Sequence, residues 1–261
     1  MKKSIKFLGV LISIIGASHA AAHDGREGGC SDLPSYTELK SALQATVSVD
    51  DSGFNLPMWA TVVNRDGVVC AVAYSGNNRG SQWPGSRVIS AQKANTANAF
   101  SLDNLALSTG NLYSAVQGPD ASNNSFGGSL YGLQLSNPVD PAVAYRGDPT
   151  KVGTRADPMI GFRIGGINVF GGGLALYNSS HQVIGGLGLS GDTSCADHNQ
   201  AWRVRHALAL DYVTGGVSGD DSRPDNIVYD SLNGNHNSKT DGWEQPTCVN
   251  TADPGVLPAV R

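Results

Sequence analysis

The chain has 261 residues, of which 33 are glycine and only 15% are charged. This length suits one large domain, and the composition is that of a turn-rich folded protein rather than a disordered one. Its 18 basic and 22 acidic residues leave a net charge of −4 with neutral histidines. That balance argues against nucleic acid as a partner, because such binding needs a basic footprint.

Residues 1–22 have the organisation of a secretory signal peptide, with a lysine-rich start, an apolar run over 7–16 and small residues suited to cleavage. The apolar run is shorter than the ~20 residues that span a bilayer, and no later segment approaches that length. We therefore expect a periplasmic or secreted protein without membrane contact after cleavage. Removal of the signal leaves 15 basic against 22 acidic residues, a net charge of −7.

The first predicted elements are a helix and a β-hairpin. Ser35 and Glu38 form a capping box, and apolar residues at helical spacing follow it, which predicts a helix of about four turns. Two strands, over 58–63 and 68–74, are joined through an Asp-Gly turn, a strong hairpin signal.

A second helix is expected from about Ser86, with small residues that allow tight packing on a sheet. Periodicity is then lost over 110–157, a stretch rich in Gly, Asn, Ser and Pro with scattered tyrosines. Structureless segments of this length are often lids or binding loops. A surface insertion stabilised by its own aromatic residues is the alternative.

The most informative segment is 165–209, where nine glycines lie between positions 165 and 191. It predicts a strand over 169–177, a tight turn, a second strand over 182–189, and a last helix from about Ser194 to about Val213. The glycines let backbone approach backbone, or a ligand, closely. A polar extension with little periodicity occupies 214–261.

This order of elements predicts the α+β class, with an antiparallel sheet and helices packed on it. Strands linked as hairpins exclude a doubly wound parallel sheet, whose strands alternate with helices.

Four cysteines in an exported chain indicate two disulfides, for which three pairings exist. If the first helix packs antiparallel to the first strand, its start lies near the hairpin. Cys30 precedes that helix and Cys70 follows the hairpin turn, so we favour the pair Cys30–Cys70. The pair Cys195–Cys248 then ties the extension to the start of the last helix.

Three blocks of the sequence resemble the GlcG/HbpS family of haem-binding proteins, which is related to the carboxy-terminal domain of PduO-type proteins. Residues 64–69 look like the family's Asp-x-x-Gly hairpin turn, and residues 91–100 like its Ala-x-x-Lys-Ala-x-Thr-Ala-x-x-Phe helix. Residues 183–191, followed by Asp197, look like its Val-Ile-Gly-Ala-Ile-Gly-Val-Ser-Gly strand and the next helix.

The resemblance implies a profilin-like α–β sandwich over 23–213, frequent homo-oligomerisation, and haem or another small molecule as ligand. It implies no agreed enzymatic reaction. The chain departs from the family in its insertion at 110–157, its extension at 214–261 and its disulfides.

The ligand-binding candidates surround the glycine-rich strands and the second helix. Lys93 could neutralise a ligand carboxylate or a haem propionate, or it could be an exposed helical lysine. Ser190 nearly completes a nucleophile elbow, but Asp192 occupies the last glycine position, and a turn and helix-cap role suits it better. The backbone candidates are Gly165, Gly166, Gly171 and Gly172, which precede strands and therefore do not form a dinucleotide fingerprint.

Haem iron takes a His, Met, Tyr or Cys ligand, and the histidine candidates are His181, His198 and His206. Eight helical residues rise ~12 Å, so His198 and His206 cannot bind one metal together. A satisfied polar or surface role is the alternative for each of them, and no ligand is assigned.

Three functions therefore remain open. The first is an exported protein that binds haem or a related small molecule without turnover. The second is an enzyme acting on a small organic acid held by Lys93 and backbone amides, although no acid–base pair stands at informative spacing. The third is an oligomeric structural or interaction module.

Overall fold

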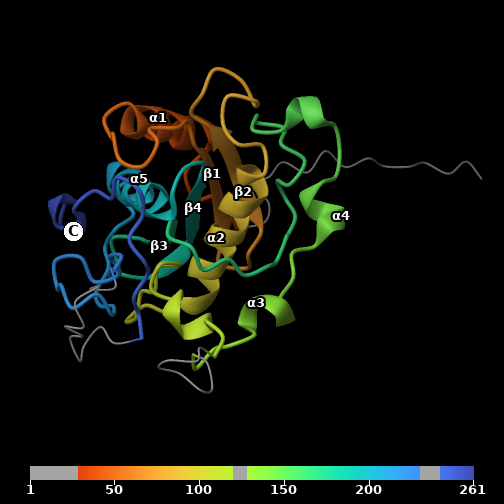
Figure 1. Cartoon of the computed structure of the whole chain (residues 1–261). Helices are drawn as coiled ribbons and strands as arrows, with labels where there is room; N and C mark the ends of the chain where they lie inside the picture. Colours follow the sequence, from red (N-terminus) through yellow and green to blue (C-terminus); the bar gives the residue numbers. More distant parts are fainter. Residues whose placement is uncertain (1–28, 120–127, 230–241) are drawn as a thin grey trace, which may run out of the picture.

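The computed structural model describes residues 29–119, 128–229 and 242–261 (Figure 1). Its centre is an antiparallel sheet of four strands in the order β2-β1-β4-β3. The strands are β1 (Trp59–Asn64), β2 (Val69–Tyr74), β3 (Gly173–Tyr177) and β4 (Val183–Ser190). Two hairpins thus stand side by side and are joined through the pairing of β1 with β4.

Three long helices cover the sheet: α1 (Tyr36–Val47), α2 (Ser86–Phe100) and α5 (Ser194–Ala207). Helices α1 and α5 pack on one face and α2 packs on the other (Figure 1). The predicted α+β class, with an antiparallel sheet and packed helices, is confirmed.

The sheet is buried on both faces, and β1 shows how its residues are divided. Successive side chains of a strand point to opposite faces. Ala60 and Val62 accordingly join the core beneath α1 and α5, whereas Trp59 and Val63 join the core beneath α2. This arrangement explains why every residue of the strand is buried.

The glycines of β4 hold α2 unusually close to the sheet. A Cβ atom on Gly188 would lie 1.9 Å from the Ser90 carbonyl oxygen, and one on Gly186 would lie 2.2 Å from that of Ala94. No side chain fits between the two elements at these positions. Gly186 and Gly188 therefore serve the packing of helix on sheet.

Local sequence signals place most element boundaries correctly, and two boundaries differ from expectation. Strand β3 begins at Gly173 rather than at 169, because Gly172 has φ +117° and turns the chain away from the ladder. Helix α5 ends at Ala207 rather than near Val213. Ala209 takes φ +54° there, and Asp211 then pairs with Tyr177 at the sheet edge.

The described part of the insertion runs along the β2 side of the sheet and forms two short helices, α3 (Leu133–Ser136) and α4 (Pro141–Ala144) (Figure 1). It is fixed to the core by Ala144, which is fully buried in the cluster beneath α2. A buried ion pair between Arg87 of α2 and Asp157 fixes its end.

The carboxy-terminal extension also contributes to the core. Leu257 is buried with α1 and α5, and Ile227 is buried as well. Asp225 forms a fully buried ion pair with Arg205 of α5, with 2.6 Å between Nη1 and Oδ2. Arg261, the last residue, forms a further ion pair with Asp211. Single apolar residues and ion pairs thus hold a segment that lacks any periodic pattern against the core.

Both disulfides are paired as predicted, Cys30 with Cys70 and Cys195 with Cys248. The first ties the segment before α1 to β2, and the second ties the extension to the start of α5. None of the helices in the described ranges is long and apolar enough to cross a membrane. The predicted signal peptide lies outside the described residues.

Candidate functional site

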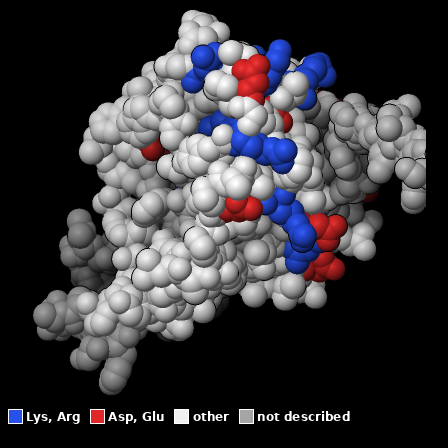
Figure 2. All heavy atoms as spheres, turned by 90° about the vertical axis from the view of Figure 1, so that its right-hand side faces the viewer, with Lys and Arg blue, Asp and Glu red and all other residues white. Residues whose placement is uncertain are grey.

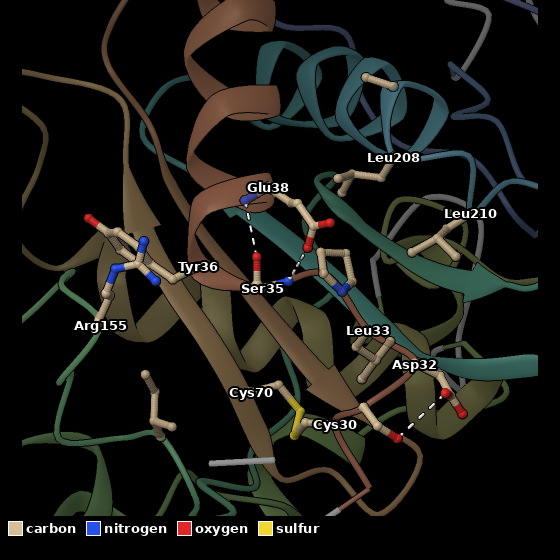
Figure 3. A pocket seen from close by; sticks show the side chains of 14 residues that line it. Cys30, Asp32, Leu33, Ser35, Tyr36, Glu38, Cys70, Arg155, Leu208 and Leu210 are labelled. Atoms are coloured by element: carbon tan, nitrogen blue, oxygen red, sulfur yellow. Dashed lines mark hydrogen bonds between the residues drawn. A yellow bond between two sulfur atoms is a disulfide. The ribbon is translucent and has the colours of Figure 1, made fainter. Parts of the chain in front are cut away.

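A groove of about 710 Å³ opens beside the amino-terminal end of α1 (Figure 3). The segment before the helix forms one wall and the residues that follow α5 form another. Apolar side chains that line it are Leu33, Pro34, Ile160, Leu208 and Leu210, and the Cys30–Cys70 disulfide lies in its wall. Ligand pockets commonly measure ~300–1,000 Å³, so the groove can hold a drug-sized or larger organic molecule.

The capping box predicted at the start of α1 shapes this end of the groove. The Ser35 hydroxyl accepts from the Glu38 backbone N–H, and the Glu38 carboxylate accepts from the Ser35 backbone N–H at 2.8 Å (Figure 3). Both residues line the groove while satisfying the first turn of the helix. The groove wall is therefore held by local backbone bonds.

Arg155, from the end of the insertion, lies at the edge of the groove (Figure 3). Its guanidinium lies 5.3 Å from the centre of the Tyr36 ring and donates to the Thr37 hydroxyl. A cation over an aromatic face is favourable. The lining of the groove thus combines apolar side chains with polar and charged ones, and Arg155 is its one cationic side chain among the described residues.

Lys93 lies away from the groove. It belongs to α2, and its side chain reaches the end of β4 and the start of α5. It is 1% exposed, and its Nζ donates to Asp197 Oδ2 at 2.6 Å and to the Leu189 carbonyl at 3.1 Å. The exposed-lysine alternative is therefore wrong. A ligand-binding role for Lys93 stays a prediction, and its observed partner is Asp197.

The carboxylate of Asp197 also organises the turn that follows β4. Its Oδ1 accepts from the backbone N–H groups of Gly191 and Asp192, at 3.0 and 2.9 Å. Burial raises the pKa of Asp197 to about 6, against the opposing effect of the Lys93 charge. The pair links three elements inside the protein, away from the residues that line the groove.

The glycine candidates and Ser190 lie in contacts within the protein itself. A Cβ on Gly171 would lie 2.5 Å from the Ser194 carbonyl oxygen, and one on Gly172 would lie 2.5 Å from that of Leu189. Gly165 and Gly166 both have positive φ and follow the insertion. Ser190 is buried at the end of β4, opposite Trp59. These residues do not line the groove.

The three histidine candidates are separate from one another and from the groove. The Nδ1 of His181, in the β3–β4 turn, lies 3.0 Å from the Tyr212 carbonyl oxygen, and that of His206 lies 2.7 Å from Asp211 Oδ2. His198 is completely buried, and its Nε2 accepts from the Ile227 backbone N–H at 3.0 Å. Burial lowers the pKa of His198 to about 4, so it is neutral at physiological pH.

The chain is similar to known proteins over most of its folded part. A family model described as haem degrading protein HbpS-like matches residues 36–204, and the chain belongs to this HbpS-like family. The resemblance inferred from the three sequence blocks is confirmed. A search of curated proteins finds no match.

Several solved structures are similar to the chain at low identity. Klebsiella pneumoniae protein ORFY is 24% identical, with 66% of this chain and 86% of that chain covered and a TM-score of 0.43. A complex of PduOC with heme is 21% identical, with 66% and 89% covered and a TM-score of 0.43. A double mutant of Streptomyces reticuli HbpS is 14% identical, with 66% and 83% covered and a TM-score of 0.36.

The residues that line the groove were largely missed by sequence reasoning. Leu208 and Leu210 fall in a stretch that reads as a continuation of the last helix, and they line the groove because the helix ends before them. Arg155 belongs to an insertion without periodicity. The interpretation of that insertion as a binding loop was the one available signal.

Proposed function

We propose that the protein binds haem or a related small molecule in the groove beside α1. The observation that carries this proposal is the groove itself, a cavity of about 710 Å³ lined by both polar and apolar side chains, with Arg155 at its edge, in a chain of the HbpS-like family. A porphyrin has an apolar ring and two carboxylates. The apolar side chains of the lining suit the ring, and a guanidinium suits a carboxylate.

Haem iron takes an axial ligand from the protein, commonly His, Met, Tyr or Cys. Of the residue types that ligate haem iron, the described lining of the groove offers Tyr36, Cys30 and Cys70. The two cysteines are joined to each other, and the Tyr36 hydroxyl accepts from Lys40 at 3.4 Å. Tyr36 is therefore the one residue of these types in the described lining that is not in a disulfide, and its side chain extends toward Arg155 and away from Leu208 and Leu210 (Figure 3). His23 lies outside the described residues.

Titration of the purified protein with haemin tests the proposal. Saturable binding with a shifted Soret band is expected, and the shift should disappear when bulky residues fill the groove, as in Leu208→Trp with Leu210→Trp. An unchanged haemin spectrum and no saturable binding would refute the proposal. The matched control is Leu135→Trp, at an 85% exposed position in α3 outside the groove.

The family description names haem degradation, so the competing function is turnover of the bound ligand. Of these two functions we propose binding, and the fate of the bound haem in air distinguishes it from degradation. A stable Soret band after addition of ascorbate in air is expected. A Soret decay faster than that of free haemin, with release of iron, would instead establish degradation.

We also propose export and self-association. Two disulfides suit an oxidising compartment such as the periplasm or the extracellular medium. Mass spectrometry of the exported protein is expected to find an amino terminus between positions 20 and 24. Homo-oligomers are expected from the family resemblance, and light scattering of the purified protein measures their mass.

A further inference from the structure

We infer that Arg155 binds a carboxylate of the ligand, so that the groove selects amphipathic carboxylic acids over their neutral esters. This inference rests on the proposed function and adds the ligand's chemical class and the residue that recognises it. The supporting observations are the position of the guanidinium, the way the protein holds it and the distribution of charge around it.

The groups that orient the Arg155 guanidinium carry no charge, so they do not neutralise it. The Tyr36 ring and the Thr37 hydroxyl are both uncharged. They fix the plane of the guanidinium at the edge of the groove and leave its positive charge in place. A guanidinium held in this way can donate two parallel hydrogen bonds to a carboxylate.

The backbone that carries Arg155 is anchored two residues further on. The side chain of Asp157 is fully buried and accepts from Arg87 Nε at 2.8 Å. It also accepts from the backbone N–H groups of Gly153 and Met159, at 2.7 and 2.9 Å. These contacts around Asp157 restrain the segment, which lowers the entropy that Arg155 loses on binding.

The charged side chains of the described lining are one guanidinium, Arg155, and two carboxylates, Asp32 and Glu38. Basic and acidic side chains lie interspersed on the face of the molecule that Figure 2 shows. Lys40 lies on the same side as Arg155, with its Nζ 5.8 Å from the centre of the Tyr36 ring. Asp32, a carboxylate of the groove wall, lies across the groove from Arg155, and the other carboxylate of the lining, Glu38, is held in the capping box (Figure 3). A bound acid is therefore expected to direct its carboxylates toward Arg155 and away from Asp32.

The test is a cycle of two changes, Arg155→Ala in the protein and esterification in the ligand. Metal-free protoporphyrin IX and its dimethyl ester are titrated by fluorescence into the full chain, so that iron ligation does not contribute. Arg155→Ala is expected to weaken binding of the diacid about five- to tenfold and that of the diester less than twofold. Arg155→Lys, which keeps the charge and loses the fork, should lie between.

Arg146→Ala is the matched control, because this arginine is also in the insertion but lies over Phe162, with 3.7 Å between its Cζ and the ring centre. It should leave both affinities unchanged. Equal loss of diacid and diester binding in Arg155→Ala would overturn the inference while leaving the groove as the binding site. Absence of saturable binding of either porphyrin to the wild-type protein would overturn the proposed function as well.

Discussion

At the scale of single residues, the Lys93–Asp197 pair places two opposite charges inside the protein. Both side chains are almost completely buried, and each is the charged partner of the other. Lys93→Met leaves a buried carboxylate without its cation, which typically costs ~3–5 kcal/mol of folding free energy. Urea denaturation is expected to show a loss of this size. The double variant with Asp197→Asn removes both charges and should recover part of it; no recovery would contradict the pairing.

Two neighbouring residues of α5 are expected to give stability opposite dependences on pH. The pKa of Asp197 rises from 3.8 to about 6 on folding. Protonation of this carboxyl therefore adds to the free energy of unfolding below pH ~4, and this stabilisation is lost as pH rises through 6. The pKa of His198 falls from 6.5 to about 4 on folding. The neutral imidazole therefore adds to the free energy of unfolding above pH ~6.5, and this stabilisation is lost as pH falls through 4.

The histidine contribution is measured by comparing the wild-type protein with His198→Gln, whose amide oxygen can replace Nε2 as the acceptor for Ile227. Between pH 6.5 and 4, the difference in unfolding free energy between the two proteins should change with a slope of ~1.4 kcal/mol for every unit of pH. A difference that is constant over this range would mean that the buried imidazole is not the titrating group.

At the scale of elements, the contact between α2 and β4 depends on the absence of side chains. Gly188→Ala places a Cβ 1.9 Å from the Ser90 carbonyl oxygen, so the helix must move away from the sheet. Overpacking of this kind typically costs ~1–3 kcal/mol, and the main-chain contact here indicates the upper end. Gly85→Ala, before α2, meets nothing within 4 Å and serves as the control. Thermal denaturation should separate the two variants clearly.

Elements with local signals were predictable, and those set by distant contacts were not. The capping box at Ser35 and the Asp-Gly hairpin turn act within a few residues, and the structure contains both elements. The start of β3 depends on Gly172, where the backbone has a positive φ and where β4 and α5 lie too close for a side chain. Sequence periodicity carries no information about such an approach.

At the scale of the whole molecule, two segments without periodicity are fixed to the core by arginine–aspartate pairs. Arg87 of α2 holds the insertion at Asp157, and Arg205 of α5 holds the extension at Asp225. The groove needs the insertion because Arg155 comes from its end and Ile160 follows it directly. A site made from such segments could not be predicted from the sequence, because partners tens of residues apart leave no spacing signal.

The two disulfides should be equivalent in stability and different in function. They join residues 40 and 53 positions apart, and chain-entropy estimates give ~4 kcal/mol for loops of either length. Cys30→Ser with Cys70→Ser, and Cys195→Ser with Cys248→Ser, should therefore lower the urea midpoint to a similar degree.

Only the first of these double variants alters the groove, because Cys30 and Cys70 line it whereas Cys195 and Cys248 do not. Loss of the first bond frees the wall before α1 from β2, so porphyrin affinity should fall in that variant alone when both are measured well below their urea midpoints. Equal affinities in the two variants would show that the wall keeps its place without the disulfide. Weaker binding in the second variant alone would move the ligand site toward the start of α5 and the extension.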